Sequence, residues 1–329
     1  MPKLREVGEF EALRRLIDAR RPGSGVVIGP GDDAAVLAPG SGREIVVTTD
    51  ALVEGRHFLP EWLEPPARGA RLATMNLSDL AAMAAEPRWA TLSLGLRQDH
   101  DLDALLELQR GVDETLAPLG AAIVGGNLTA VEGSEWYDLA LIGEVAAGAA
   151  WKRSGARAGD FIMVSGSPGR AGAGLRLARR LGEGARDPRW RSLIDAWRMP
   201  VARIALSRAL LPTGAVRAAI DLSDGLAADL ERMARASAVA VEVDLGALPA
   251  DPDLENAATE LGIEAAALRL GASDDYELIL AVAPGRDESI ARAASEVGVS
   301  LHVIARAAKG SGVVWRGGPA AAGFDHFSS

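Results

Sequence analysis

Aspartates recur in this chain where an apolar segment stops or a helical segment begins. Carboxylate oxygens are the ligands that hard cations such as Mg²⁺ prefer, and several such ions together can hold a polyphosphate. Ligands of open α/β sheets also collect beyond the carboxyl ends of the strands. We therefore predict an oxygen-only site for several Mg²⁺ ions and a polyphosphate. The candidate aspartates are Asp32, Asp33, Asp50, Asp79, Asp221, Asp224, Asp274 and Asp275.

Each of these acidic positions also has an ordinary structural explanation. The stretch IGPGDDAAVL, residues 28–37, favours a tight turn when it is considered alone. Ser78, Ser223 and Asp224 could cap helices, and the two aspartates in SDDY could be turn residues. We favour the metal site because so many similar coincidences occur in one acidic chain without cysteine.

The composition limits the chemistry that is available. The 329-residue chain has no cysteine, which excludes disulfides, thiolate nucleophiles, zinc fingers and iron–sulfur clusters. Its four histidines are scattered without a metal-binding spacing, so any metal must be bound mainly by oxygen. The net charge of −10 argues against a general nucleic-acid binder. Divalent cations can still attach a phosphorylated ligand to an acidic protein.

We expect neither a membrane span nor a secretory signal. No stretch reaches the roughly 18 uninterrupted apolar residues of a transmembrane helix. Residues 1–17 are charged and amphipathic, without the apolar segment of a signal peptide. These patterns predict a cytoplasmic protein whose partners are small molecules rather than nucleic acids or membranes.

The usual phosphate-binding loops are absent from the sequence. The chain has no G-x-x-x-x-G-K-[ST] motif, and none of its three lysines stands in such a loop. SGSPGRAGAGL, residues 165–175, follows a predicted strand and opens a predicted helix, but its glycines do not fit G-x-G-x-x-G. We predict that these glycines allow close packing of the helix on the sheet.

Short apolar segments alternate with helical segments in both halves of the chain. A linker-like stretch near Gly148 divides them into two α/β domains, residues 1–148 and 149–329. The first half is predicted to have strands over 43–50, 88–96, 121–126 and 137–146 and helices over 70–86 and 101–120. The second half is predicted to have strands over 160–166, 216–221, 239–245 and 276–283 and helices over 171–181 and 223–237.

Several short segments stand in an informative order along the chain. They are GDDAAVL, TTDALVEGRHF, NLSDLAAMAAEP, GGNLT, KRSGARAGD, DLSDGLAADL, DDYEL and GFDHF. In this order they resemble the thiamine-monophosphate kinase family over nearly the whole chain. TTDALVEGRHF and NLSDLAAM are close to diagnostic of that family, which belongs to a superfamily of ATP-using enzymes that includes aminoimidazole ribonucleotide synthetase.

The resemblance implies a fold and an activity. The fold is a two-domain α/β (α+β) fold of the aminoimidazole ribonucleotide synthetase type, whose N-terminal domain pairs its sheet in a homodimer. The activity is direct in-line transfer of a phosphoryl group from ATP to thiamine monophosphate with Mg²⁺, which gives thiamine diphosphate. Residues 1–148 would bind ATP and Mg²⁺ and form the dimer, and residues 149–329 would close the active site.

The resemblance also assigns roles to particular residues. The implied Mg²⁺ ligands are Asp33, Thr48, Thr49, Asp50, Asp79, Asn127, Asp221 and Asp224. The implied nucleotide contacts are Gln109, Gly125, Gly126, Asn127, Arg153 and Ser223. His57, Asp274 and Phe324 would contact the thiamine phosphate. No residue is implied as a general base, since the acceptor is a weakly basic phosphate; the metal ions and Arg153 would stabilise the transferring phosphoryl group.

Three of these positions depart from the family pattern. Asn127 stands where the family has Asp, and its amide oxygen can bind Mg²⁺ but supplies no charge. We therefore expect one metal position to be weak or empty. Asp274 shortens a carboxylate that is Glu in the family, and Gln109 stands where the family often has an aromatic residue beside the nucleotide base.

Other interpretations remain for both the residues and the function. His57 could be a surface histidine, Arg153 a solvated linker charge, and Phe324 an apolar anchor for the C-terminal tail. The protein could also be a superfamily enzyme that acts on another phosphorylated acceptor. A third alternative is a non-catalytic protein that binds a nucleotide or a thiamine phosphate.

Overall fold

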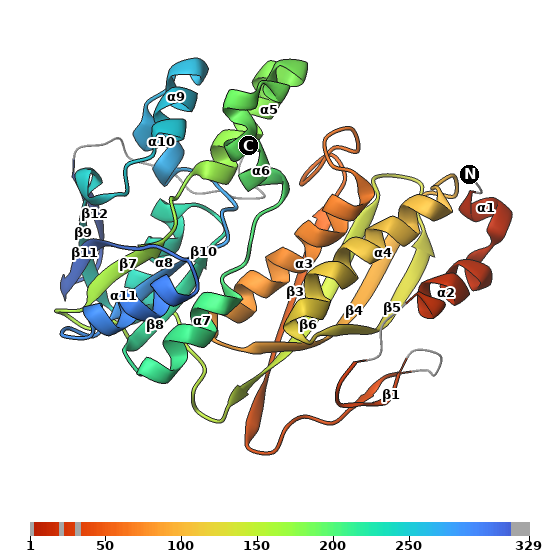
Figure 1. Ribbon diagram of the computed structural model, residues 1–329, viewed down its shortest axis with the longest axis horizontal. Coiled ribbons are helices and arrows are strands. Elements are labelled where there is room, and N and C mark those ends of the chain that lie inside the picture. The colour runs from red at the N-terminus through yellow and green to blue at the C-terminus, as the bar shows by residue number, and fades with distance from the viewer. Residues whose placement is uncertain (1–2, 20–22, 30–33, 317–329) are drawn as a thin grey trace. The chain divides into compact units, whose positions relative to one another are not determined.

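The computed structural model describes residues 3–19, 23–29 and 34–316 of the chain (Figure 1). The chain forms two compact units, each with its own sheet. The N-terminal unit comprises Met1–Leu80 and Ala85–Ala149, and the C-terminal unit comprises Ala81–Ala84 and Ala150–Ser329. Over the described ranges, no helix combines the length and the apolar character that a bilayer crossing requires.

The N-terminal unit is built on a four-stranded sheet. Its strands lie in the order β3-β6-β4-β5, with β4 and β5 parallel and the other two pairs antiparallel. Two short strands, β1 and β2, pair with each other in antiparallel orientation, apart from the main sheet. The bounds are β1 Val26–Ile28, β2 Val36–Leu37, β3 Arg43–Val53, β4 Glu86–Leu96, β5 Ala122–Ala130 and β6 Trp136–Ala146.

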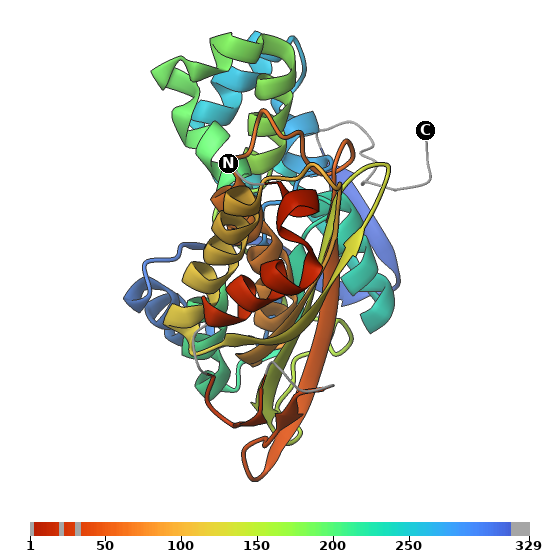
Figure 2. The ribbon, with the colours of Figure 1, turned by 90° about the vertical axis from the view of Figure 1, so that its right-hand side faces the viewer.

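The two faces of this sheet have different environments. Tyr137, Leu139 and Leu141 of β6 are fully buried, whereas the alternating Asp138 and Ala140 are partly exposed. Because successive side chains of a strand point to opposite faces, one face of the sheet is covered and the other is open. Helices α3 (Pro65–Ala82) and α4 (Leu102–Leu116) lie over the covered face (Figures 1 and 2).

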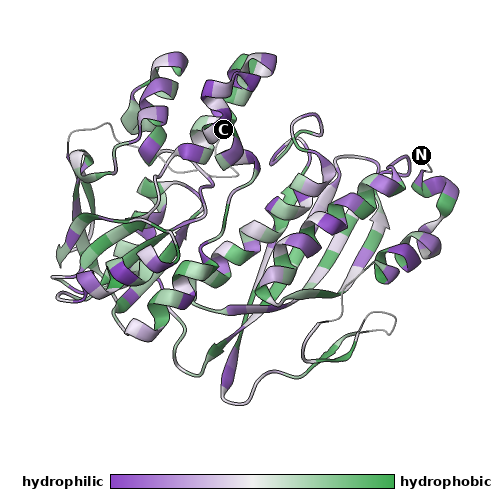
Figure 3. Cartoon of the chain, viewed as in Figure 1, coloured by the Kyte–Doolittle hydropathy of each residue, from purple (hydrophilic) through white to green (hydrophobic). Residues whose placement is uncertain are grey.

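Helices α3 and α4 cross at very close range. A Cβ atom on Gly111 of α4 would lie 2.0 Å from the carbonyl oxygen of Pro66, and one on Gly69 of α3 would lie 2.0 Å from that of Leu108. Glycine is therefore required at both positions for this backbone approach. Apolar and polar residues alternate around both helices, as an amphipathic helix on a sheet requires (Figure 3). The short helices α1 (Leu4–Val7) and α2 (Glu9–Asp18) precede the sheet.

The predicted helix over residues 70–86 has wrong bounds. It starts five residues earlier, at Pro65, and ends at Ala82, because Ala84 adopts a left-handed φ of 55° and the backbone N–H of Ala85 donates to the carbonyl of Leu80. Glu86 and the residues that follow instead pair with β6. Tertiary strand pairing thus overrides the helical pattern of an alanine-rich segment.

The C-terminal unit contains a six-stranded sheet. Its order is β12-β9-β11-β7-β10-β8, and all neighbours are antiparallel except the parallel pair β12 and β9. The bounds are β7 Phe161–Ser165, β8 Val216–Leu222, β9 Val239–Asp244, β10 Glu277–Val282, β11 Leu301–Lys309 and β12 Gly312–Arg316.

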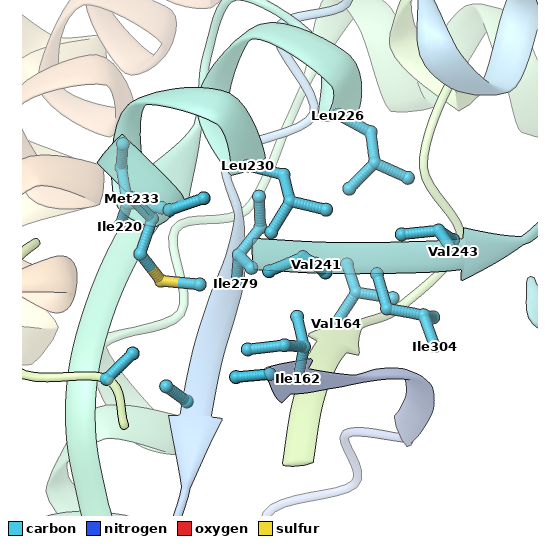
Figure 4. Packing of buried hydrophobic residues seen from close by; sticks show 14 of the residues in the cluster. Ile162, Val164, Ile220, Leu226, Leu230, Met233, Val241, Val243, Ile279 and Ile304 are labelled. Atoms are coloured by element: carbon cyan, nitrogen blue, oxygen red, sulfur yellow. The ribbon is translucent and has the colours of Figure 1, made fainter. Parts of the chain in front are cut away.

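One helix of the C-terminal unit supplies much of its core. Helix α8 (Leu226–Ser237) directs Leu226, Leu230 and Met233 against side chains of the sheet such as Ile220 and Ile279 (Figure 4). A second apolar cluster joins α5, α9 and α10 through residues such as Leu177, Leu254 and Leu268. The remaining α-helices are α5 Arg170–Leu181, α6 Arg191–Arg198, α7 Ile204–Leu210, α9 Pro252–Leu261, α10 Ala265–Leu270 and α11 Asp287–Glu296. Short 3₁₀ helices cover Ala117–Leu119, Gly182–Arg186, Pro188–Trp190, Leu211–Thr213 and Leu245–Ala247.

Candidate functional site

Three of the candidate ligands lie on the covered face of the N-terminal sheet. Thr48 and Asp50 of β3 pair with Leu141 and Leu139 of β6, whose side chains are fully buried under the helices. The hydroxyl of Thr48 donates a 2.5 Å hydrogen bond to Oδ2 of Asp79, which projects from α3. Helix packing thus brings Asp79 to the row of β3 side chains that includes Asp50.

Two other candidates lie on the open face. Thr49 alternates with Thr48, and its hydroxyl lies 3.2 Å from each carboxylate oxygen of Asp138 on β6. Asn127 of β5 lies on the same face, because the register pairs it with Ser93 and pairs Ser93 with Asp138. The predicted ligands of this unit are therefore divided between two faces of one sheet.

Asp138 is not among the candidates predicted from the sequence. It is the second residue of the predicted strand 137–146, whereas ligands of an open sheet are expected beyond the carboxyl ends of strands. The sequence nevertheless contains a signal for it. Asp138 alternates with apolar residues in YDLALIGEVA, and this alternation predicts that its side chain lies on the exposed face of the strand.

Gly125 and Gly126 directly follow an irregularity in β5. The register with β4 skips Val124, since Ala90 pairs with Ile123 and Thr91 with Gly125. A Cβ on Gly126 would lie 2.0 Å from the carbonyl oxygen of Leu92, so only glycine fits this approach of the strands. The β-bulge leaves the backbone around Gly126 and Asn127 at an exposed part of the strand.

His57 and Gln109 both bind the backbone of the N-terminal unit. Nδ1 of His57 accepts a 3.0 Å hydrogen bond from the backbone N–H of Val53, which orients the ring and leaves the proton on Nε2 in the neutral form. Nε2 of the buried Gln109 donates to the carbonyl of Leu16 and so connects α4 to α2. Gln109 therefore has a structural role that its sequence position did not reveal.

In the C-terminal unit, Asp221, Ser223 and Asp224 occupy the end of β8 and the turn before α8. Asp229 accepts hydrogen bonds from the backbone N–H groups of Ser223 and Asp224, at 3.1 and 2.9 Å. Nη1 of Arg232 donates to Asp224 and, at 2.6 Å, to Oδ1 of Asp229. Asp229 is buried, and burial raises its pKa.

Those contacts correct the alternative in which Ser78, Ser223 and Asp224 cap helices. The residue that precedes α8 is Gly225, which makes no side-chain cap, and Ser78 lies inside α3. Asp229 orders the turn from within the helix instead. This arrangement holds the carboxylate of Asp224 beside a guanidinium group.

The glycine-rich turn before α5 is closed by acidic and hydroxyl side chains. Asp275 accepts hydrogen bonds from the N–H groups of Gly169 (2.6 Å) and Ala171 (2.8 Å), and Ser273 accepts one from Gly172 (2.8 Å). A Cβ on Gly172 would lie 2.6 Å from the carbonyl oxygen of Ala272. These glycines do allow a close approach, but the prediction that they pack the helix on the sheet is wrong for Gly172, whose partner is the loop residue Ala272.

Asp275 is expected to make the stability of the fold depend on pH. Burial raises its pKa from 3.8 to about 6, against the opposing effect of the two backbone N–H groups. Because the pKa of Asp275 is higher in the folded state, its contribution to the stability of the fold is complete below pH 3.8 and is lost as the pH rises through about 6. Relative to an Asp275→Asn variant, the wild type should lose on the order of 3 kcal/mol across this window.

Denaturant unfolding of both proteins at several pH values measures that difference. Glu296→Gln, which removes an exposed carboxylate from α11, is the matched control. A difference between the wild type and Asp275→Asn that stays constant from pH 4 to pH 7 would contradict the prediction.

A second buried acid, Glu277, begins β10 beside β8. Arg203 holds it with two hydrogen bonds, from Nε to Oε2 at 2.6 Å and from Nη2 to Oε1, and the hydroxyl of Ser165 also donates to Oε2. Glu277 is not among the candidates predicted from the sequence. Because both carboxylate oxygens of Glu277 accept hydrogen bonds, we assign this residue a structural role in the C-terminal unit.

The remaining candidates have the following positions. Arg153 is exposed, and no carboxylate among the described residues lies within 4.0 Å of its guanidinium group. Asp274 is half-buried in the loop before β10. Asp32, Asp33 and Phe324 lie outside the described residues.

Comparisons with known proteins cover most of the chain. The model described as AIR synthase related protein, N-terminal domain, matches residues 31–145, and the corresponding C-terminal domain matches residues 157–316. The thiamine-monophosphate kinase of Mycobacterium tuberculosis is 36% identical over 280 residues, which are 84% of this chain and 81% of that protein.

Solved structures also match this chain over most of its length. The crystal structure of thiamine-monophosphate kinase from Stenotrophomonas maltophilia has a TM-score of 0.82 and 32% identity, covering 94% of this chain and 95% of the other. A structure described as AaThiL complexed with AMPPCP and TMP has a TM-score of 0.79 and 27% identity, covering 99% of both chains. The predicted two-domain fold is confirmed by these matches.

Proposed function

Because the chain belongs to the thiamine-monophosphate kinase family, we propose that it transfers a phosphoryl group from ATP to thiamine monophosphate. The observation that carries the proposal is the 36% identity to a kinase of that name over 84% of the chain. The resemblance seen in the order of short motifs is thereby confirmed. A structural relative that was solved with AMPPCP and TMP supports both the nucleotide and the acceptor.

The residues of the chain suit Mg²⁺ as the metal. Every described candidate ligand offers an oxygen atom. In the N-terminal unit, the proposed Mg²⁺ ligands at the covered face of the sheet are Thr48, Asp50 and Asp79. Those on the open face are Thr49 and Asn127. Asp221 and Asp224 would do so in the C-terminal unit, and Asp33 joins the proposal from its sequence alone. When bound, Mg²⁺ would neutralise part of the negative charge on the phosphate oxygens.

The scattered arrangement of the acids fits a metal that arrives with its nucleotide. Within residues 3–19, 23–29 and 34–316, no three His, Asp or Glu side chains form a group able to hold a metal ion. Protein sites for Mg²⁺ commonly use one or two carboxylates together with substrate phosphates. The phosphates of ATP would therefore complete the coordination.

The other proposed contacts follow from accessibility and chemistry. Arg153 pairs with no carboxylate of the described residues, and its planar guanidinium fork suits phosphate oxygens. The partly exposed Gly125 and the exposed Gly126 suit close approach of the nucleotide to the backbone. We retain Ser223 as a nucleotide contact, whereas the buried Gln109, which was the other candidate, binds the carbonyl of Leu16 instead. His57, Asp274 and Phe324 are the proposed contacts of thiamine monophosphate. In-line transfer to a phosphate needs placement and charge stabilisation rather than a general base.

The open face of the N-terminal sheet supports the proposed homodimer. Ile45 and Val47 of β3 are 45% and 64% exposed on this face, next to the partly exposed Ala140 and Ile142 of β6. An apolar sheet face of this kind is typical of an interface. We further propose residues 1–148 and 149–329 as the nucleotide-binding and closing domains of a cytoplasmic enzyme.

The purified chain, incubated with thiamine monophosphate, ATP and Mg²⁺, is expected to form thiamine diphosphate. Mass spectrometry of the products identifies the new compound by the addition of one phosphoryl group. ATP turnover with a different phosphorylated acceptor, or nucleotide binding without turnover, would refute the proposed reaction and support one of the two alternative functions.

A further inference from the structure

A buried carboxylate stands beside the loop that carries His57. This loop comprises residues 54–58 and follows β3 directly. Glu135, which immediately precedes β6, is only 2% exposed, and its backbone carbonyl accepts a 2.9 Å hydrogen bond from the N–H of Glu54. Since the side chain of Glu135 is buried, it can affect a bound substrate only through its neighbours.

The carboxylate of Glu135 gathers donors from three other residues. Oε1 accepts a 3.1 Å hydrogen bond from the backbone N–H of Arg97, and the hydroxyl of Tyr137 donates to Oε2 at 3.2 Å. Nδ1 of His100 lies 2.9 Å from Oε1 and 3.0 Å from Oε2. Burial by itself would raise the pKa of Glu135, but these contacts, led by the hydrogen bond with His100, lower it. The carboxylate is therefore charged at neutral pH and accepts every one of these bonds.

Two partners of Glu135 also hold the two ends of the loop. At its start, Oε2 of Glu54 accepts a hydrogen bond from the guanidinium group of Arg97 and one of 3.2 Å from the backbone N–H of Glu135. At its end, the buried ring of Phe58 stacks on Tyr137, with ring centroids 5.3 Å apart and an interplanar angle of 22°. The position of the whole loop thus depends on the groups that Glu135 gathers.

The loop in turn fixes the backbone and the ring of His57. The N–H of Gly55 donates to the carbonyl of Phe58, and the N–H of His57 donates to the carbonyl of Val53, both at 2.8 Å. The N–H of Val53 donates to Nδ1 of His57 at 3.0 Å. Because both its backbone and its ring are held, the direction of the His57 side chain follows from the position of the two ends of the loop.

We propose that Glu135 is a positioning residue for the phosphorylated acceptor, which acts by holding the loop that carries His57. This inference rests on the proposed function, in which His57 contacts thiamine monophosphate. Misplacing a substrate contact by about 1 Å can cost about 10²-fold in rate, even when the mutation lies far from the reacting atoms. Loss of the Glu135 carboxylate should therefore weaken the use of the acceptor and leave that of the nucleotide unchanged.

The test variant is Glu135→Gln, which keeps the volume of the side chain but turns an N–H₂ group toward donors. Steady-state kinetics should show a KM for thiamine monophosphate that rises on the order of tenfold, with the KM for ATP unchanged. Should this variant fail to fold, Glu54→Gln carries the same test, because its side chain is 20% exposed and binds the same Arg97. An equal rise in both KM values would contradict the inference.

The matched control is Glu144→Gln, at the opposite end of β6. Glu144 is also buried, and it accepts hydrogen bonds from the backbone N–H of Gly40 at 2.7 Å and from Nε of Arg88 at 3.1 Å. Its loss removes a comparable buried carboxylate without touching the loop, so both KM values should stay as in the wild type. A rise in the KM for thiamine monophosphate as large as that of Glu135→Gln would mean that any buried acid of this sheet has the same effect.

A double-mutant cycle shows whether the effect passes through His57. In a His57→Ala background, Glu135→Gln should raise the KM for thiamine monophosphate no further, because the contact that it positions is already absent. Additive effects of the two substitutions would overturn the proposed route.

NMR of the ring nitrogens gives a readout that does not depend on activity. The hydrogen bond from Val53 keeps neutral His57 in the tautomer with its proton on Nε2, and the signal lost in His57→Ala identifies this ring among the four histidines of the chain. We expect Glu135→Gln, but not Glu144→Gln, to give a mixture of His57 tautomers. Unchanged His57 signals in folded Glu135→Gln would overturn the inference. Changed signals in a protein that makes no thiamine diphosphate would retain the positioning of His57 and refute only the proposed reaction.

Discussion

An Asp79→Asn variant is expected to keep its fold and to lose about 10²- to 10³-fold in kcat/KM for thiamine monophosphate, the scale seen when one preorganised charge-stabilising group is removed. Asp79 lies half-buried on α3 and accepts a hydrogen bond from Thr48. Asparagine can still accept that bond, but it offers no charge to a divalent cation. Steady-state kinetics at saturating Mg²⁺ measure the loss.

The control for this prediction is Glu64→Gln. Glu64 is an exposed acid immediately before the same helix, so Glu64→Gln removes one negative charge from the unit, as Asp79→Asn does. Thermal unfolding of both variants establishes that the fold persists. If Asp79→Asn were as active as Glu64→Gln, Asp79 would have no part in phosphoryl transfer.

A Gly111→Ala variant is expected to destabilise the N-terminal unit by about 2 kcal/mol. Helix propensity alone predicts the opposite, a gain of about 1 kcal/mol, since alanine is the better helix former. The new Cβ, however, would lie 2.0 Å from the carbonyl oxygen of Pro66, and backbone atoms cannot move away without separating α3 from α4. Overpacking of this kind costs up to about 3 kcal/mol, which outweighs the propensity.

Denaturant unfolding and differential scanning calorimetry measure this change, which corresponds to a fall of about 4–8 °C in Tm. Gly133→Ala is the control, because no atom lies within 4 Å of the added methyl group. The sign of the change in stability shows whether overpacking or helix propensity dominates at Gly111. A Gly111→Ala protein that is more stable than the wild type would mean that propensity dominates and that the helices can separate freely.

The elements of the fold were largely predictable from local patterns. Alternation of apolar and polar residues located β6, for example, and the buried residues Tyr137, Leu139 and Leu141 follow that alternation. Boundaries were less predictable. The end of α3 depends on the left-handed conformation of Ala84 and on the pairing of Glu86 with β6, and neither is encoded in the alanine-rich stretch itself.

The positions of the candidate ligands show a similar division. Thr48 and Thr49 are neighbours in the sequence, yet they point to opposite faces of the sheet, where one contacts Asp79 and the other Asp138. Strand alternation predicts that they diverge. Which acid each one meets depends on strand order and on the packing of α3, and these are properties of the folded chain.

The sequence by itself determined the chemistry of this protein. Its supply of aspartates, its lack of cysteine and the order of its motifs limit the site to oxygen ligands and identify the kinase family. The tertiary structure decided which of the acids are available. Asp275 closes the start of α5, and Asp229 orders the turn before α8, while Asp138 on the open face makes no ion pair with any described residue. Type and spacing of residues are local, but the availability of a carboxylate depends on which distant groups the fold brings to it.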